Sequence, residues 1–249
     1  MKLIRSVIAY TLGVITMTIT TLFCLPIAML PAKYRYDNRL YHRLISTCSR
    51  LLFFFGSVKY EIRGKENLLF FSQDPAIYIM NHTSSLDIPI VEVILKDQPK
   101  IWISKISYTK VPLFGFILKR MHVIANRESS MMLKRVISDV ITLTKDKKRH
   151  LVLFPEGRRN DDGQIHDFFP GVTIFSEKVN RPIVQIAIYG FHKIFPKNRI
   201  CLDYDFGVAK ISIGKPIMRS SFATRDEFIE HVQGWFRMEI GRASCRERV

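Results

Sequence analysis

The amino-acid sequence predicts an α/β protein, a mixed β-sheet flanked by helices, preceded by an N-terminal membrane helix or helical hairpin. Three observations predict this fold. Short apolar runs of strand length, such as 76–80 and 183–188, recur along the chain. Longer segments with helical periodicity separate these runs. Finally, the N-terminal region contains a long stretch without a charged side chain.

Strands are expected near 58–62, 76–80, 101–103, 122–125, 151–154, 183–189, 200–206 and 210–213. Helices are expected near 86–96, 105–120, 128–146, 171–179 and 222–238. No repeat, low-complexity stretch or linker divides this region, so a single domain is expected over 58–238, with a membrane-anchoring segment over 1–57.

The membrane segment is predicted from residues 6–32, which carry no charge and exceed the roughly 20 apolar residues that span a bilayer. Pro26 and Pro31 are expected to kink or end the helix. A cleaved signal peptide is disfavoured, since no small-residue cleavage site follows a short apolar core. Two arrangements stay open: a spanning helix, or a hairpin dipping into one leaflet with 40–55 as its second arm. Basic residues are more numerous after the segment than before it, which predicts a cytoplasmic catalytic domain.

A histidine and an aspartate five residues apart directly follow the apolar run 76–80, in Asn81-His82-Thr83-Ser84-Ser85-Leu86-Asp87. One turn of chain lets the Asp87 carboxylate reach the His82 imidazole. There it would fix the tautomer and stabilise the imidazolium, leaving the other ring nitrogen to take a proton. By itself this spacing is weak evidence for a catalytic pair, because a helix N-terminus with polar capping residues can have the same sequence pattern.

A second constellation follows the apolar run 151–154, in Pro155-Glu156-Gly157-Arg158-Arg159. The planar guanidinium fork of arginine suits phosphate. Another short apolar run, 123–125, ends in Asn126-Arg127. Polar and charged side chains therefore follow several predicted strands, where loops on a rigid scaffold carry function.

In four ordered blocks the chain resembles the glycerolipid acyltransferases, typified by 1-acylglycerol-3-phosphate acyltransferase. Residues 81–87 match the family's Asn-His, four residues, Asp. Residues 154–160 match Phe-Pro-Glu-Gly-Thr-Arg-Ser, except that Arg158 replaces Thr and Asn160 replaces Ser. Gly115 to Arg127 resembles the second block and Pro182 to Ile186 the fourth, so the similarity runs from about Val58 to Ile217.

The resemblance implies transfer of a fatty acyl chain from acyl-CoA or acyl carrier protein to the sn-2 hydroxyl of 1-acylglycerol 3-phosphate, forming phosphatidic acid. It implies that His82 is the general base and that Asp87 orients it. The implied acceptor-binding residues are Arg127, Glu156, Gly157 and Arg159. Apart from the resemblance, we predict Lys105, in the helix leading to Pro112 and Gly115, as a second phosphate cation. No metal or other cofactor is implied.

Composition agrees with an anionic lipid partner. The formal net charge is +16, which favours phospholipid headgroups, coenzyme A phosphates or an acidic carrier protein. Nucleic acid is disfavoured because no nucleic-acid-binding signature is present. The four cysteines lack metal or redox spacing, so no disulfide framework is expected. Residues 239–249 match what a common sequencing adapter would encode, and we expect this tail to be non-native.

Other functions stay open. Within the class, the acceptor could be another lysophospholipid or glycerol 3-phosphate. A non-catalytic lipid-binding membrane protein of the same fold is a second possibility. A thioesterase or lipase is a third, although Ser84 and Ser85 lack the flanking glycines of a nucleophile elbow.

Overall fold

The computed structural model describes residues 2–69, 74–125, 130–160, 162–196 and 201–245. Its strands are β1 (Lys59–Arg63), β2 (Ile77–Met80), β3 (Lys100–Lys105), β4 (Val123–Ala125), β5 (His150–Leu153), β6 (Ile183–Tyr189) and β7 (Val208–Ile213). The α-helices are α1 (Lys2–Met29), α2 (Ala32–Arg35), α3 (Arg39–Phe55), α4 (Glu66–Leu69), α5 (Asp87–Leu95), α6 (Phe114–Met121), α7 (Ser130–Thr144), α8 (Gly171–Val179), α9 (Phe191–Ile194) and α10 (Arg225–Cys245). Two short 3-10 helices are η1 (Ile106–Lys110) and η2 (Arg219–Ser221).

The strands form one sheet in the order β1-β7-β6-β2-β5-β3-β4. All neighbouring strands pair in parallel except β6 and β7, which are antiparallel. The predicted mixed sheet is therefore confirmed. Strands β2 and β5, which precede the two motif loops, are direct neighbours at its centre, with Ile77 opposite Leu151.

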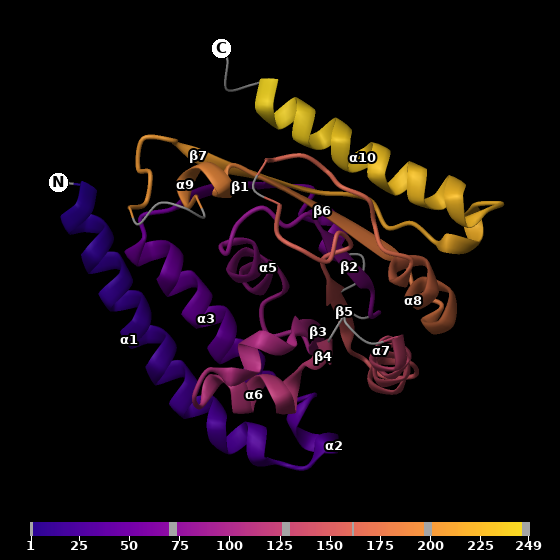
Figure 1. Ribbon diagram of the computed structural model, residues 1–249, viewed down its shortest axis with the longest axis horizontal. Coiled ribbons are helices and arrows are strands. Elements are labelled where there is room, and N and C mark those ends of the chain that lie inside the picture. Colours follow the sequence, from indigo (N-terminus) through magenta and orange to yellow (C-terminus); the bar gives the residue numbers. More distant parts are fainter. Residues whose placement is uncertain (1, 70–73, 126–129, 161, 197–200, 246–249) are drawn as a thin grey trace.

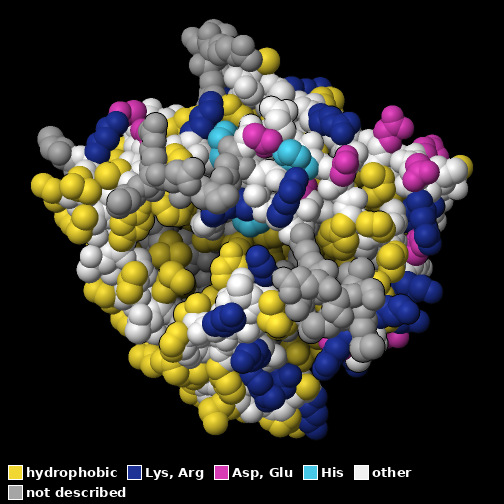
Figure 2. All heavy atoms as spheres, in the orientation of Figure 1, with side chains coloured by type: hydrophobic (Ala, Val, Ile, Leu, Met, Phe, Trp, Pro, Cys, Tyr) yellow, Lys and Arg dark blue, Asp and Glu magenta, His cyan; other side chains and the backbone are white. Residues whose placement is uncertain are grey.

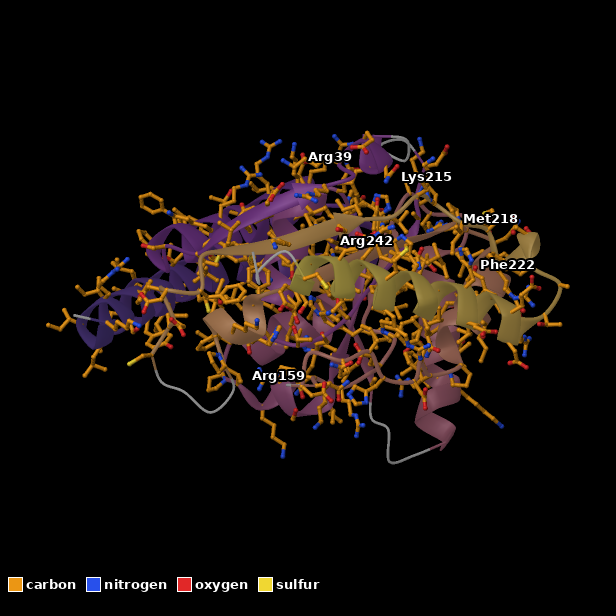
Figure 3. All side chains as sticks on the ribbon, turned by 90° about the horizontal axis from the view of Figure 1, so that it is seen from above. Arg39, Arg159, Lys215, Met218, Phe222 and Arg242 are labelled. Carbon is orange, nitrogen blue, oxygen red and sulfur yellow. The ribbon has the colours of Figure 1, made fainter. Side chains whose placement is uncertain are left out.

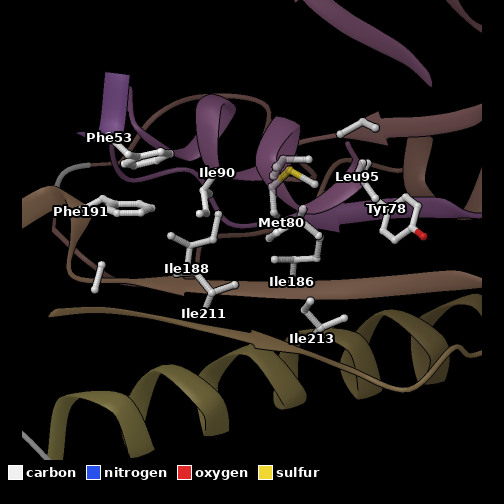
Figure 4. Close-up of a cluster of buried hydrophobic side chains, with 14 of the residues drawn as sticks. Phe53, Tyr78, Met80, Ile90, Leu95, Ile186, Ile188, Phe191, Ile211 and Ile213 are labelled. Atoms are coloured by element: carbon white, nitrogen blue, oxygen red, sulfur yellow. The ribbon is translucent and has the colours of Figure 1, made fainter. Parts of the chain in front are cut away.

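Helices cover both faces of this sheet, with α1, α3 and α5 on one face and α7, α8 and α10 on the other (Figure 1). Successive side chains of a strand point to opposite faces, and β2 is buried throughout. Tyr78 and Met80 enter the core beneath α3 and α5, together with Phe53 and Ile90 (Figure 4). Ile77 and Ile79 enter the second core, beneath α7, α8 and α10.

The N-terminal segment is a helical hairpin. Helices α1 and α3 lie side by side, joined through α2 (Figure 1). A Cβ on Gly13 would come within 3.2 Å of Leu52 Cδ2, so glycine allows this close approach. Helix α1 has 28 residues and a mean hydropathy of 2.0 over its most apolar stretch, which is long and apolar enough to cross a membrane.

Two predicted elements were wrong. The strand expected at 200–206 is absent from the described residues 201–206. There the main-chain N–H of Leu202 donates to Ser6 Oγ at 3.0 Å and that of Asp203 donates to the Ile194 carbonyl at 2.8 Å, instead of to a neighbouring strand. The helix expected at 105–120 is split into η1 and α6, because Pro112 disfavours helical geometry in the residue before it. Lys105 is consequently the last residue of β3, not part of a helix.

The C-terminal helix was expected to end at 238, but α10 continues to Cys245. The helix therefore includes the described part of the suspected tail. That residues 239–249 are non-native stays a prediction.

Candidate active site

The two motif loops meet at one edge of the sheet, because β2 and β5 are adjacent and parallel. Ligands of open α/β sheets bind outside the carboxyl ends of the strands. Figure 3 shows Arg159 at this edge and Lys215 at the opposite edge. Figure 2 looks onto the Arg159 edge and shows a hollow bordered by hydrophobic, histidine and Lys or Arg side chains.

The pair His82 and Asp87 lies at the end of β2. His82 Nδ1 is 3.0 Å from Asp87 Oδ2, and the Asp87 side chain is fully buried. The same carboxylate oxygen accepts the main-chain N–H groups of Thr83 and Ser84, each at 2.7 Å. Asp87 therefore holds both the imidazole and the loop that carries it. These bonds favour a tautomer with a proton on Nδ1 and a lone pair on Nε2.

The face of the His82 ring is held by Phe154, the first residue after β5. The ring stacks on Phe154, with centroids 3.9 Å apart and an interplanar angle of 16°. The side chain of His82 is 15% exposed, so the imidazole is held by protein yet reachable from outside. The structure thus orients an accessible nitrogen that is free to accept a proton.

Glu156 joins the two loops. Its Oε1 accepts the His82 main-chain N–H at 3.2 Å, and its Oε2 accepts Asn160 Nδ2 at 2.7 Å and the His166 N–H at 3.2 Å. The main-chain N–H of Asn160 also donates to the His82 carbonyl at 2.9 Å. Burial raises the pKa of the Glu156 carboxyl above its ordinary value, although these hydrogen bonds oppose the shift. Both carboxylate oxygens are therefore occupied by protein donors, which favours a positioning role.

Asn81 fixes the other side of the β2 end. Its side chain donates to the Ile188 carbonyl at 2.9 Å and accepts the Ile188 N–H at 2.8 Å. The residue before His82 is thereby tied to β6, which fixes the start of the loop that carries the imidazole.

The predicted acceptor-binding residues are brought together only in part. Arg159 Nη1 donates to Ser85 Oγ at 2.6 Å, so this arginine lies beside the His82 loop. Gly157 has φ +67°, a conformation that glycine adopts without strain and that turns the chain toward Arg159. Lys105 ends β3 at the same edge, with an exposed side chain. Arg127 lies outside the described residues.

Three contributors were not predicted from sequence: the ring contact of Phe154, the Ser85 hydroxyl beside Arg159, and the Asn160 side chain. All three residues lie inside the recognised motifs, so their positions were visible but their partners were not. Phe154 carries no polar group that would have singled it out.

The acyltransferase family profile matches residues 59–189, which is more than half of the chain. A chloroplastic 1-acyl-sn-glycerol-3-phosphate acyltransferase of Brassica napus is 30% identical over 200 residues, which cover 78% of this chain and 55% of the relative. An enzyme of the same name from Borreliella burgdorferi is 26% identical over 163 residues, covering 65% of this chain and 64% of the relative. The chain spans about half the length of the chloroplastic enzymes of Brassica napus and Arabidopsis thaliana that it matches.

The crystal structure of the acyltransferase PlsC from Thermotoga maritima superimposes with a TM-score of 0.74 at 20% identity, over 97% of this chain and 98% of that one. That likeness bears on the fold alone. The profile match, however, includes both motif loops and the strands that carry them. On this ground the chain belongs to the acyltransferase family.

Proposed function

We propose that this protein transfers a fatty acyl chain from acyl-CoA or acyl carrier protein to the sn-2 hydroxyl of 1-acylglycerol 3-phosphate, forming phosphatidic acid. The observation that carries the proposal is the 3.0 Å contact between His82 Nδ1 and Asp87 Oδ2 beneath an accessible imidazole. The acceptor is proposed from the names of the relatives, several of which are 1-acyl-sn-glycerol-3-phosphate acyltransferases.

In the proposed reaction, His82 Nε2 takes the proton of the acceptor hydroxyl as its oxygen attacks the thioester carbonyl carbon. Asp87 stabilises the resulting imidazolium. The tetrahedral oxyanion then collapses, the carbon–sulfur bond breaks, and the departing thiolate takes the proton back from His82. General-base catalysis of this kind contributes about 10²–10⁴-fold, and fixing both substrates in register contributes a further factor. This acid–base chemistry requires no metal or cofactor.

The acceptor phosphate is assigned to Arg159, which Ser85 holds beside the His82 loop. Arg127 and Lys105 are proposed as further cations around it. Arg158, where the family has threonine, is exposed next to Arg159 and adds positive charge to the same loop. A planar guanidinium that binds phosphate bidentately is not replaced by lysine without loss.

We further propose that α1 lies within one leaflet and that the catalytic domain faces the cytoplasm. A helix of 28 residues is about 42 Å long. Near its start, Arg5 lies over the Tyr204 ring at 4.1 Å; near its end, the Ala28 carbonyl accepts Arg120 Nε at 3.0 Å. Contacts with the domain at both ends support a helix lying along the domain rather than leading away from it.

The test is acyl transfer by the purified full-length protein in mixed vesicles, followed by mass spectrometry. The acceptors are 1-acylglycerol 3-phosphate, glycerol 3-phosphate and 1-acylglycerophosphocholine, each offered with acyl-CoA and with acyl carrier protein. We expect phosphatidic acid as the main product. His82→Ala should lower kcat by about 10²–10⁴-fold, whereas His231→Ala, at an exposed position on α10, should not.

Each competing reading has its own outcome in this assay. Full activity in His82→Ala would overturn the mechanism. Acyl release to water without any acceptor would indicate a thioesterase. Binding of lysolipid without turnover on either donor would indicate a lipid-binding protein.

The phosphate assignment is tested separately. Arg159→Lys keeps the charge but loses the fork, so KM for 1-acylglycerol 3-phosphate should rise about tenfold with a smaller change in kcat. KM for the acyl donor should stay constant. An unchanged acceptor KM would remove Arg159 from the phosphate site.

A further inference from the structure

Residues 106–116, which run from the end of β3 into the first turn of α6, expose an unusual amount of apolar surface. Its exposed apolar side chains are Ile106, Tyr108, Val111, Leu113 and Phe116. Soluble proteins rarely gather large apolar side chains in one exposed patch unless it binds something. We call residues 106–116 the β3–α6 segment.

The backbone holds this apolar surface in place. Leu113 has φ +58°, which is unfavourable for a residue with a side chain. The following turn is tight: the Gly115 N–H donates to the Val111 carbonyl at 2.7 Å, and a Cβ on Gly115 would collide with the Thr109 carbonyl. A strained turn thus holds Leu113 with 52% of its surface exposed. Burial in the protein core does not account for this strain.

The charge around the segment has one sign. Residues 98–127 contain six lysines and arginines and no aspartate or glutamate. Lys105, Lys110 and Lys119 are exposed. In Figure 2 the part of the face that overlies α1 and α6 shows hydrophobic side chains interspersed with Lys and Arg, whereas most acidic side chains lie elsewhere. Apolar side chains among cations fit an anionic lipid surface.

The segment also continues the surface of the N-terminal helix. Arg120 Nη2 donates to the Leu30 carbonyl at 3.1 Å, and Arg35 Nε donates back to the Arg120 carbonyl at 2.8 Å. These bonds fix the end of α1 to α6. Met29 and Tyr34, next to this junction, are exposed as well. The apolar surface therefore extends from α1 into the catalytic domain.

We propose that the β3–α6 segment is a second membrane-docking element, which inserts Leu113 and Phe116 into an anionic bilayer while Lys110 contacts the lipid phosphates. Because β3 ends at the same edge of the sheet as β2, this contact sets the candidate active site at the membrane surface. An acceptor lipid then reaches His82 directly from the bilayer. The docking contact itself concerns membrane binding; only the delivery of an acceptor lipid to His82 rests on the proposed function.

The first experiment measures the partition of the full-length protein onto vesicles of pure phosphatidylcholine and of phosphatidylcholine with one quarter phosphatidylglycerol. Leu113→Ser and Phe116→Ser should each lower the partition coefficient by about tenfold on both vesicles, since each removes an apolar side chain that the bilayer would otherwise bury. Met238→Ser on α10 is the matched control, because Met238 is 44% exposed and Phe116 is 43% exposed. It should have no effect.

Charge is tested by Lys110→Gln, which should weaken partition by about fivefold on the anionic vesicles and leave it unchanged on the neutral ones. Lys148→Gln, at an exposed position after α7, is its control and should change neither. Equal losses for Lys110→Gln and Lys148→Gln would contradict a specific docking contact.

A fluorescence measurement tests the proposal even where α1 alone binds all of the protein to the vesicles, so that the substitutions do not change the partition coefficient. Leu113→Cys and Met238→Cys are made in a chain whose Cys201 and Cys245 are replaced by serine, and each is labelled with an environment-sensitive fluorophore. On anionic vesicles the label at 113 should shift to the blue and the label at 238 should not. No shift at 113 overturns the proposal. So does a shift at 113 in lipid-free solution that depends on protein concentration, since a second copy of the chain would then cover the segment.

Discussion

The imidazole of His82 and the phenyl ring of Phe154 lie nearly parallel, 3.9 Å apart between centroids. Phe154 is the first residue after β5, and His82 is the second after β2, so the pairing of two central strands brings the rings together. The ring of His82 is thereby fixed in two directions, through its face by Phe154 and through Nδ1 by Asp87. The proposed base owes its orientation to residues from both motifs.

Removing the stack should slow catalysis without weakening binding. Phe154→Leu keeps an apolar side chain but loses the flat surface, so the ring of His82 can tilt. We expect kcat to fall by about 10- to 100-fold, because small errors in placement are costly in a positioned reaction, while KM for both substrates stays within about twofold. Steady-state kinetics measure this. Phe154→Tyr, which keeps the stack, should retain most of kcat; equal losses in both variants would show that the stack is not what matters.

Replacing the Asp87 carboxylate should lower kcat strongly even where the fold is kept. Asp87→Asn can still accept the N–H groups of Thr83 and Ser84 through its remaining oxygen, so the loop should persist. The amide oxygen can still accept the Nδ1–H of His82, but a neutral amide cannot stabilise the imidazolium as the carboxylate does. We expect kcat to fall by about 10³–10⁴-fold with a normal circular dichroism spectrum. A loss below tenfold in a folded protein would argue against the general-base role.

The contact between Glu156 and Asn160 predicts a rescue. In Glu156→Gln one carboxylate oxygen becomes an N–H₂ group, which faces a donor in either orientation: the His82 N–H on one side, or Asn160 Nδ2 and the His166 N–H on the other. The junction between the two loops should therefore weaken. We expect a loss of about 1–3 kcal/mol in stability and a lower kcat with little change in KM. Adding Asn160→Asp restores a donor–acceptor pair in the opposite sense and should recover part of both losses.

Asn160→Asp alone is the control for this cycle. It places a second carboxylate beside buried Glu156, so it should be more damaging than the double variant. Strictly additive effects would mean that the two side chains are not coupled. A role for Glu156 in direct acceptor binding would instead raise the acceptor KM in Glu156→Gln and in the double variant alike.

Much of the fold could be predicted because the decisive signals are local. The apolar run 183–189 reads as a buried strand and the segment 171–179 as a helix, and both have the expected bounds. The contact of His82 with Asp87 is also local, since one loop and the first turn of α5 hold both. The break at Pro112 was visible in the sequence as well, but periodicity on either side of it suggested one continuous helix.

The remainder of the site depends on strand pairing, which a single sequence does not determine. Phe154 reaches His82 only because β5 lies beside β2, although the two residues are 72 positions apart. Glu156 was expected to bind the acceptor because of the motif it occupies. Only the folded loop shows that both of its carboxylate oxygens already accept hydrogen bonds, from His82, Asn160 and His166. The acceptor contact itself stays a prediction.

His150 offers a test of the core beneath the site. Its ring is buried at the start of β5, its Nδ1 accepts the Ala76 N–H at 3.0 Å, and it packs edge-on against Tyr78. Burial, with the nearby charges of Lys100 and Arg181, lowers the pKa of His150 to about 4. The residue is therefore neutral in the folded protein over a range in which the unfolded chain would be protonated.

This difference predicts how stability depends on pH. Between about pH 6.5 and pH 4 the unfolded state binds a proton at His150 and the folded state does not, so stability is lost as the pH falls through this window. The contribution of this group has a slope of up to about 1.4 kcal/mol per pH unit. His150→Asn keeps an acceptor for the Ala76 N–H but cannot be protonated. It should be less stable at pH 7, because the contact with Tyr78 is lost, yet its stability should fall less steeply on acidification. Urea unfolding at half-unit steps measures both slopes, and parallel curves would show that His150 is not neutral in the folded state.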